Sequence, residues 1–495
     1  MAWQLLLSSF YFLRHTTQQK GTALMFSSFL KRSVLALAGA AGLALTLTVG
    51  AQANALEGTN VQSTVLDNGL TVAVVEDHRA ERVAINLCFK VGSFDEPLGM
   101  GGLAHAFEHS WFNGSRNMPE GQYSAFLSQR GSVGVNAFTM QDRTCYVATV
   151  ATRYLGDALW LYGETWANLE LNDARFQKER GAIIAERDMR TDNNPQARFF
   201  EKFTQYHLPN HPYGRPVIGS MTDINGWVLS DLQNWFKTNY VPNNAYLVLV
   251  GDITLDQAKQ VAQEHFGTLA HGNPPFVNNG YAEPKWTAPK RMPTVVDPQA
   301  GNPIMVRQYR VGGAFAGLAG AEGDQRKSVA LALAVRLMSE GQTSYLQRRL
   351  ILQEKKALYV SVGYNNETRS ESSMTVYGVP APGVTLAELE KAIDAALADW
   401  LAEQRFTQDD LNRLKIKTMA ALEYSKDSVG ATARLVGNYL TGGGAVATLN
   451  DWIQIQDETT AADIMTAARE AFDINQSTTA YLTPRAELTG EPTHE

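Results

Sequence analysis

The sequence predicts an α+β protein built from two related halves, each a mostly antiparallel sheet with helices packed on one face. The chain has 495 residues, which is too many for one ordinary hydrophobic core. A proline-rich stretch divides it, and seven of the eighteen prolines fall between residues 271 and 303. The order of strand-like and helix-like runs before this stretch recurs after it. These observations predict two domains of similar architecture.

The first half, residues 56–270, begins with an Asp-Asn-Gly turn at residues 67–69 that leads into an apolar run, which is typical of a hairpin. A short helix opened by Gly101 and Gly102 has an apolar stripe of Leu103, Phe107 and Trp111. Further strands are expected over residues 82–91, 131–139, 144–150 and 243–252. Longer helices are expected over residues 154–169, 173–190 and 254–266, with helical stretches within 220–239.

We interpret residues 271–303 as an interdomain linker, because prolines are dense there and no periodic pattern is present. The second half, residues 304–495, is expected to contain strands at 304–309, 357–365 and 372–379, a helix at 325–338, and more helices to about residue 440. The 325–338 helix takes the place of the Leu103 helix but has no histidine. The second half is therefore predicted to be structural and to form the other wall of a cleft.

The N-terminus resembles a targeting segment. Residues 1–24 are interpreted as an upstream extension and residues 25–55 as a signal peptide, with a basic Lys31-Arg32 pair, an apolar run over 33–49 and two Ala-x-Ala cleavage sites. An uncleaved membrane anchor is the alternative, because the apolar run is nearly long enough to span a bilayer. Cleavage predicts a periplasmic protein whose mature chain has no membrane span.

The net charge and the two cysteines bear on the binding partners of the protein and on its disulfide content. The net charge of −7 and a pI near 5.8 give no electrostatic reason to expect nucleic-acid binding. Cys88 and Cys145 both fall in strand-like runs. They could form a disulfide if the two strands are neighbours in an oxidising compartment, or each could be a buried thiol. The sequence alone leaves this open.

The most informative motif is His105-x-x-Glu108-His109. On a helix, His105 and His109 lie one turn apart with Glu108 beside them. Two histidines so spaced can bind one Zn²⁺, and the neighbouring carboxylate can accept a proton from metal-bound water. The alternative is a surface helix whose polar side chains only face solvent. The pattern favours a metallohydrolase, and it is the inverted form of the His-Glu-x-x-His zinc motif.

A catalytic zinc site of this kind needs a third protein ligand. The helix predicted over residues 173–190 contains Glu179 and Glu186, which are seven residues apart and therefore on one face. Either carboxylate could be a ligand while the other supports a ligand histidine. The alternative for both is an exposed acidic stripe.

These motifs together resemble the pitrilysin/insulysin family of inverzincin peptidases, and more closely the branch that holds mitochondrial processing peptidase subunits and bacterial homologues. The similarity extends through the segments 67–70, 92–96, 102–105, 136–139, 211–213, 243–245 and 251–252. It implies one Zn²⁺ per chain bound by His105, His109 and Glu186, with Glu108 as general base and Glu179 in a supporting role. It also implies two homologous domains that enclose a clam-like chamber for peptides or unfolded segments.

The resemblance further implies that substrate binds as an added strand along residues 134–139, fixed by main-chain hydrogen bonds. Asn136, Ala137 and Phe138 are the predicted substrate-binding residues. For Asn136 a turn or strand-end role is an equal alternative. The predicted reaction is endopeptidase hydrolysis by zinc-activated water, with Glu108 taking the proton and returning it to the leaving amine.

Active members of this family also use an Arg and a Tyr, seven residues apart in the C-terminal half. Alignment places Gln353 and Val360 at those positions. We therefore hypothesise that this chain is the metal-bearing subunit of a heterodimer, completed by a paralogous subunit that supplies the Arg/Tyr pair. The alternative is a non-catalytic peptide-binding or structural subunit of a larger assembly.

Overall fold

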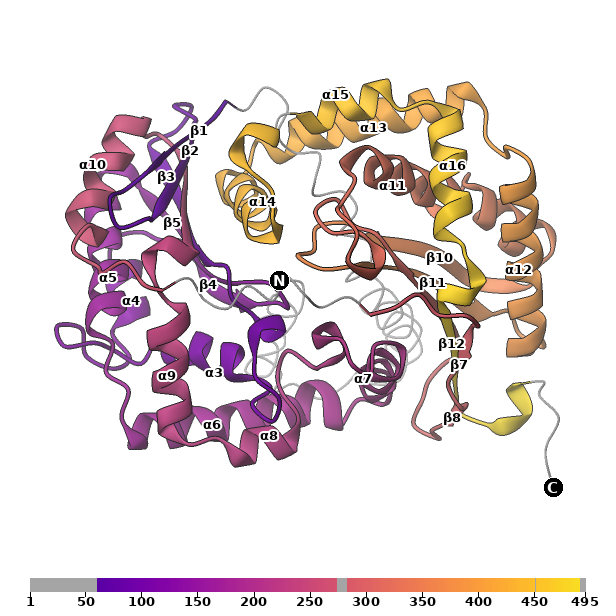
Figure 1. Cartoon of the computed structure of the whole chain (residues 1–495), viewed down its shortest axis with the longest axis horizontal. Coiled ribbons are helices and arrows are strands. Elements are labelled where there is room, and N and C mark those ends of the chain that lie inside the picture. Colours follow the sequence, from indigo (N-terminus) through magenta and orange to yellow (C-terminus); the bar gives the residue numbers. More distant parts are fainter. Residues whose placement is uncertain (1–59, 274–282, 450, 490–495) are drawn as a thin grey trace, which may run out of the picture. The chain divides into compact units, whose positions relative to one another are not determined.

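The computed structural model describes residues 60–273, 283–449 and 451–489, which form two six-stranded sheets and the helices around them (Figure 1). The predicted signal peptide and upstream extension lie outside these residues. Among the described residues, no helix combines the length and apolar character needed to cross a bilayer.

The first sheet has the strand order β1-β2-β6-β3-β5-β4. All neighbours are antiparallel except β2 and β6, which are parallel. The strands are β1 (Val61–Val65), β2 (Thr71–Glu76), β3 (Arg82–Phe89), β4 (Val133–Thr139), β5 (Thr144–Ala151) and β6 (Ala245–Gly251). β4 therefore lies at one edge of the sheet.

The second sheet has the order β10-β11-β9-β12-β7, and β8 also pairs with β12. Its strands are β7 (Lys290–Arg291), β8 (Val295–Val296), β9 (Ile304–Val311), β10 (Ala357–Asn365), β11 (Ser372–Pro380) and β12 (Ser477–Thr483). β7 and β8 fall within the stretch predicted as a linker and pair in parallel with β12, which the sequence did not predict. The mostly antiparallel α+β architecture is as predicted.

The two halves share one chain order: a central strand, a helix, a hairpin, five helices and a final strand. In the first half the helices are α3 (Leu103–Ser110), the additional short α4 (Tyr123–Ser128), α5 (Leu155–Asn168), α6 (Asp173–Arg187), α7 (Pro195–His207), α8 (Met221–Gly226) and α9 (Leu229–Asn239), and α10 (Leu255–Phe266) follows β6. In the second half they are α11 (Gln325–Ser339), α12 (Leu386–Ala402), α13 (Gln408–Ser425), α14 (Val429–Gly442), α15 (Asp451–Glu458) and α16 (Ala461–Ala471). Accordingly, β6-β3-β5-β4 corresponds to β12-β9-β11-β10.

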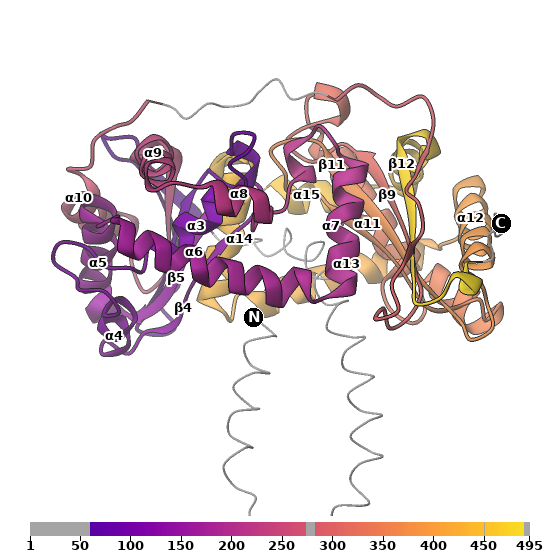
Figure 2. The same cartoon turned by 90° about the horizontal axis from the view of Figure 1, so that it is seen from below.

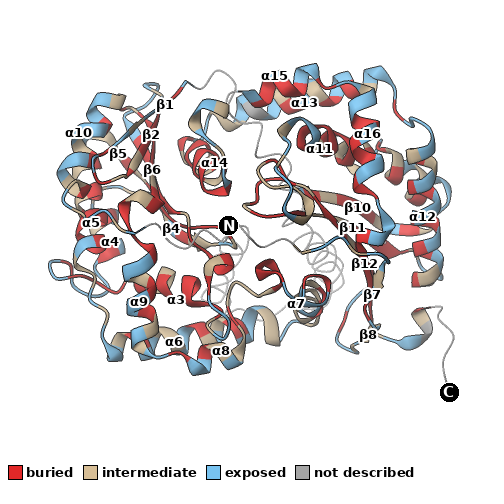
Figure 3. Ribbon diagram, in the orientation of Figure 1, coloured by how far each residue is buried: buried red, intermediate tan, exposed pale blue. Residues whose placement is uncertain are grey.

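Helices of its own half cover one face of each sheet, as the alternating apolar residues of the strands require. On the first sheet, Val72, Val74 and Ile85 face a core shared with α3, α5, α9 and α10. On the second, Met305 and Val376 face a core shared with α11, α12 and α16. Figure 3 shows the buried residues following the strands and the sheet-facing sides of these helices.

The opposite face of each sheet receives one helix from the other half. α14 contacts β3 and β6, and Asn86 on β3 donates to the carbonyl of Ala433 over 2.9 Å. α7 contacts β12, and its Phe199 and Phe203 pack with Ile304 and Val306 of β9. The sequence did not predict α7 as a helix. This exchange covers the central part of the second face of each sheet, at β3 and β6 in the first and at β9 and β12 in the second.

Cys88 and Cys145 are register partners on the neighbouring strands β3 and β5, and they form a disulfide. Gly437 of α14 lies directly against this pair, since a Cβ there would be 3.0 Å from the Cys88 sulfur and 2.5 Å from Asn86 Nδ2. The absence of a side chain at Gly437 thus lets the helix approach the sheet closely. Of the two alternatives left by the sequence, the structure contains the disulfide.

Candidate metal centre

Helix α3 begins where the backbone needs a glycine. Gly102, its N-terminal flanking residue, has a φ of +91°, and a Cβ there would be 2.5 Å from the carbonyl oxygen of Ile218. The buried Glu96 carboxylate accepts hydrogen bonds from the backbone N–H groups of Gly102 and Ala104, each over 2.8 Å. This distant side chain satisfies N–H groups that the helix itself leaves unpaired. Burial raises the pKa of Glu96 to about 8, against the effect of these two donors.

The apolar stripe of α3 fixes which way its polar residues face. Leu103, Phe107 and Trp111 are fully buried in the core of the first half, as predicted. His105 is also buried, whereas Glu108 and His109 are partly accessible. This packing leaves His105 and His109 facing α6, which lies beside α3 (Figure 2), whereas Glu108 contacts the end of β4.

Helix α6 supplies the two carboxylates. Asn172 caps its start by accepting from the N–H of Arg175 over 3.0 Å. At its end, Arg187 donates to the carbonyl oxygen of Gly219 over 2.6 Å and pairs with Glu201. With both ends of α6 held, Glu179 and Glu186 direct their side chains to the histidines of α3. These two side chains are 15% and 14% exposed, respectively. They are therefore not an exposed acidic stripe.

The structure brings His105, His109 and Glu186 together, with one potential ligand atom from each lying within 4.8 Å of the others. His109 Nε2 is 3.3 Å from Glu186 Oε2, and His105 Nε2 is 3.8 Å from Glu186 Oε1. His109 Nδ1 is 3.3 Å from Glu179 Oε2. Arg190, one turn beyond Glu186, pairs with the same Oε1 over 2.5 Å.

This donor set fits a zinc ion. Ligand atoms bound at about 2.1 Å in a tetrahedron are roughly 3.4 Å apart, which is close to the 3.3 Å and 3.8 Å that separate the two histidines from the two oxygens of Glu186. The carboxylate of Glu179 on the far nitrogen of His109 is the usual way in which a metal-binding imidazole is oriented. The buried Nδ1 of His105 has no hydrogen-bond partner among the described residues. Two imidazoles and one carboxylate leave a fourth position for water or substrate.

The protonation states of the two histidines differ. Burial lowers the pKa of His105 to about 4, so this imidazole is neutral and able to ligate at pH 7. Burial opposes protonation of His109 as well, but hydrogen bonds to Glu179 and Glu186 prevail and raise its pKa to about 9. A metal ion binding at His109 would therefore displace a proton.

Glu108 is placed apart from the three clustered ligand atoms. Its Oε2 accepts a hydrogen bond from Thr139 Oγ1 over 2.6 Å, and burial raises its pKa above the usual range. Thr139 is the last residue of β4. The segment 136–139, identified from the sequence, includes Thr139. Its contact with Glu108 could not be predicted, because the two residues are 31 positions apart and meet only in the folded structure.

β4 has the features of a strand that can accept another. It lies at the sheet edge, next to α3, and among the described residues its one strand partner is β5. Asn136 is exposed, Ala137 is buried and Phe138 is intermediate. The register shifts between Val133 and Asn136, at a bulge that includes Gly134 with a φ of +67°. The predicted substrate-binding residues thus lie on an edge strand whose last residue, Thr139, contacts Glu108.

The two positions aligned with the family's Arg/Tyr pair differ in their surroundings. Val360 is fully buried in β10, whereas Gln353 is exposed at the end of the π-helical segment η7 (Gln347–Gln353). The nearby Arg349 is bound to Asp399 over 2.9 Å and to Glu354 over 2.8 Å.

Comparison with known proteins agrees with this geometry. Residues 71–221 match the model of insulinase (peptidase family M16), and residues 227–418 match that of the peptidase M16 inactive domain. The chain is 30% identical over 427 residues to the zinc protease PqqE of Helicobacter pylori, a match covering 86% of this chain and 93% of that protein. It is 22% identical over 390 residues to the probable mitochondrial-processing peptidase subunit beta of Schizosaccharomyces pombe, covering 77% and 81% of the two chains.

Solved structures of proteases share the fold of this chain. A protease from Helicobacter pylori has a TM-score of 0.78 and 28% identity, and the match covers 86% of this chain and all (100%) of that one. The first half of the periplasmic protease PqqL from Escherichia coli shares the fold, with a TM-score of 0.71 and 18% identity over 88% of this chain and 94% of that one. The names of several relatives describe them as zinc proteases. The chain therefore belongs to the insulinase family, peptidase family M16.

Proposed function

We propose that the chain is a zinc-dependent endopeptidase that hydrolyses peptides or unfolded segments. One Zn²⁺ per chain is held by His105, His109 and Glu186, and Glu179 orients His109. The observation that carries this proposal is the convergence of the three ligand atoms within 4.8 Å, with Glu108 one residue away on the same helix. When bound, zinc supplies Lewis-acid chemistry, which polarises a carbonyl and makes water more acidic.

The chain's own residues move the proton and position the peptide. Glu108 acts as general base: it accepts a proton from the attacking water and returns it to the leaving amine. Its raised pKa brings it closer to neutral pH, where a carboxylate is a more effective base. Thr139 holds one oxygen of Glu108 and leaves the other for water. A peptide added to β4 along Asn136, Ala137 and Phe138 would run toward this carboxylate.

We propose that the active form is a heterodimer. Gln353 and Val360 occupy the aligned positions of the Arg/Tyr pair, and they lack the positive charge of Arg and the hydroxyl of Tyr. A paralogous subunit would supply it. The alternative, a non-catalytic subunit of a larger assembly, is favoured only by the match of residues 227–418 to the family's inactive domain.

We also propose that the protein is exported to the periplasm. Two features support this: the apolar run with Ala-x-Ala sites at the N-terminus, and the disulfide between Cys88 and Cys145, which persists in oxidising compartments. One of the relatives in structure is described as a periplasmic protease.

The proposal is tested with a fluorogenic peptide library, the purified chain, and the chain mixed with its paralogue, with zinc quantified in each sample. Zinc at one ion per chain, together with cleavage that rises at least tenfold on mixing, supports the heterodimeric peptidase. Full cleavage by the chain alone would remove the need for a partner. Zinc without cleavage in either sample would favour the non-catalytic alternative.

A further inference from the structure

The two halves meet through equivalent hairpin turns. In the first half the turn joins β4 to β5 through residues 140–143, and in the second it joins β10 to β11 through residues 366–371. Five of the six residues in the second turn are buried although all six are polar or charged: Asn366, Glu367, Thr368, Ser370 and Glu371. A buried polar turn of this kind requires specific partners.

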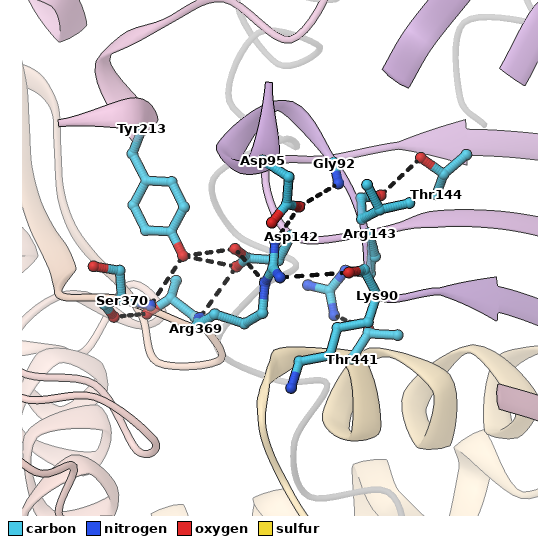
Figure 4. A network of polar contacts seen from close by, with 12 residues as sticks. Lys90, Gly92, Asp95, Asp142, Arg143, Thr144, Tyr213, Arg369, Ser370 and Thr441 are labelled. Atoms are coloured by element: carbon cyan, nitrogen blue, oxygen red, sulfur yellow. Dashed lines mark hydrogen bonds and ion pairs between the residues drawn. The ribbon is translucent and has the colours of Figure 1, made fainter. Parts of the chain in front are cut away.

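Arg369, the remaining residue of this turn, is bound to two carboxylates of the first half. Its Nη2 lies 2.5 Å from Asp95 Oδ2 and its Nε lies 3.2 Å from Asp142 Oδ1. All three side chains are nearly buried, with exposures of 11%, 10% and 4% for Arg369, Asp95 and Asp142. Figure 4 shows the guanidinium directed between the two carboxylates.

Other contacts hold this arrangement in place. Tyr213 donates its hydroxyl proton to Asp142 over 2.7 Å and accepts from the N–H of Ser370 over 3.1 Å (Figure 4). The Ser370 hydroxyl lies 2.8 Å from His211 Nε2. On the other side, Glu371 forms a buried ion pair with Arg310 of β9 over 2.6 Å. The turn is thus anchored both in its own sheet and in the first half.

Each carboxylate that Arg369 binds belongs to a segment that carries part of the candidate site. Asp95 ends the turn η1 (Ser93–Asp95) and is followed by Glu96, whose carboxylate caps α3 immediately before His105. Asp142 lies three residues after Thr139, which holds Glu108. The two segments also share backbone hydrogen bonds, from Ser93 N to Met140 O over 3.2 Å and from Phe94 N to Gln141 O over 2.9 Å.

We propose that Arg369 is a positioning residue for the peptidase site: by bridging Asp95 and Asp142 it fixes helix α3, with Glu108, relative to the edge strand β4. The inference rests on the proposed peptidase function. Arg369 does not touch the candidate ligands and acts only through the two segments. Without it, two nearby buried carboxylates would lose their shared counter-ion and separate, which would move Glu108 away from a peptide on β4.

The proposal predicts a specific kinetic signature for Arg369→Gln. The zinc ligands lie on α3 and α6, so zinc affinity should stay within threefold of wild type. The β4 strand keeps its pairing with β5, so KM should also change less than threefold. Because only the alignment of Glu108 with the bound peptide is lost, kcat should fall by about tenfold to a hundredfold.

A matched control separates positioning from general destabilisation. Arg307 also bridges two carboxylates, Glu390 and Asp394, but all three belong to the second half. Arg307→Gln should lower the melting temperature about as much as Arg369→Gln while leaving kcat unchanged. Should Arg369→Gln fail to fold, Arg369→Lys and the double variant Asp95→Asn/Arg369→Gln, which removes the excess negative charge, provide the same comparison.

The experiment is steady-state cleavage by the zinc-loaded chain with its paralogue, at a temperature well below every variant's melting point, combined with hydrogen exchange of residues 102–104 and 140–143. We expect a lower kcat and faster hydrogen exchange at both segments in the Arg369 variants, and neither change in Arg307→Gln. Unchanged kcat and exchange would overturn the positioning role and leave the peptidase function intact. If wild type cleaves no peptide, the peptidase function fails, and exchange alone decides whether Arg369 orders the two segments.

Discussion

Helices α3 and α11 occupy the same place in the two halves but serve different purposes. Each follows the central strand of its sheet, β3 or β9, and precedes the edge hairpin. α3 is eight residues long and carries His105, Glu108 and His109, whereas α11 has fifteen residues, eight of them buried and none a histidine. A duplicated helix position thus holds a candidate metal site in one half and core packing in the other.

The N-terminal caps of these two helices also differ, because one is a neighbouring residue and the other is remote in sequence. α11 is capped locally by Asp324, which accepts from the N–H of Lys327 over 3.0 Å. α3 is capped by Glu96, six and eight residues before the N–H groups that it binds. A remote cap joins the helix to another segment of the fold, and a local cap does not. Glu96 therefore fixes the start of α3 to the segment that contains Asp95, in addition to satisfying its N–H groups.

The largest expected effect comes from making α3 resemble α11. Replacing His109 by Ala removes one of the three proposed protein ligands and the partner of Glu179. Zinc binding should weaken by at least a hundredfold and cleavage should fall below detection, while the fold is retained. Atomic absorption after dialysis, with circular dichroism as the folding control, measures this. Zinc retained at one ion per chain in His109→Ala would exclude His109 as a ligand.

A core substitution in α11 should lower the stability of the protein without changing its zinc affinity. Leu333 is 2% exposed in the core of the second half, so Leu333→Ala should lower the free energy of unfolding by about 2–5 kcal/mol. Zinc affinity should be unchanged, because no candidate ligand lies in this core. Urea unfolding and a competitive zinc-chelator titration give the two values. A loss of zinc affinity at an unchanged stability would contradict the division between the two helices.

Histidines outside α3 provide a pH test. His207 on α7 is fully buried against the second half, where its Nδ1 lies 2.9 Å from Thr478 Oγ1. Burial lowers its pKa to about 3, so the folded protein holds it neutral while the unfolded chain protonates it below pH 6.5. The stability present above pH 6.5 is therefore lost as the pH falls toward 3. Between pH 7 and 5 the loss from this residue should be about 2 kcal/mol.

This loss is measured as the difference in urea unfolding between pH 7 and 5 for wild type and for His207→Gln, which does not titrate. The variant should be less stable at pH 7 and show a smaller pH dependence. An equal pH dependence in both proteins would mean that His207 is accessible to protons in the folded state.

The smallest effect concerns the caps. Glu96→Ala and Asp324→Ala should each cost about 1 kcal/mol of stability, since each removes a capping carboxylate. Only Glu96→Ala should also weaken zinc binding, by a few fold, because the helix that it caps begins two residues before His105. Equal zinc affinity in the two variants would show that the remote cap adds stability alone.

Local signals in the sequence predicted much of this molecule. The His-x-x-Glu-His spacing, the apolar stripe of Leu103, Phe107 and Trp111, and the seven-residue spacing of Glu179 and Glu186 are properties of single helices, and the structure agrees with each. The recurring order of elements predicted the two similar halves. Periodicity is readable because it depends on residues close together in the chain.

Apart from helix α7, which is a local element that was missed, the main features that the sequence did not predict depend on pairings over long distances. The Cys88–Cys145 disulfide follows from the register of β3 against β5, and the exchange of α7 and α14 follows from the packing of the halves. The contact of Glu108 with Thr139 and the cap by Glu96 likewise join segments that no short window contains. Arg369 carried no motif at all. Such contacts are set by tertiary packing and not by local propensity.

The central claim is that Glu108 performs the chemistry at a zinc ion held by α3 and α6. It is tested most directly by measuring zinc content and peptide cleavage together for wild type and Glu108→Gln, each alone and mixed with the proposed paralogous subunit. We expect one zinc per chain in both proteins, with cleavage lower by about 10²–10⁴-fold in the variant. Wild-type cleavage by Glu108→Gln at full zinc occupancy would contradict it.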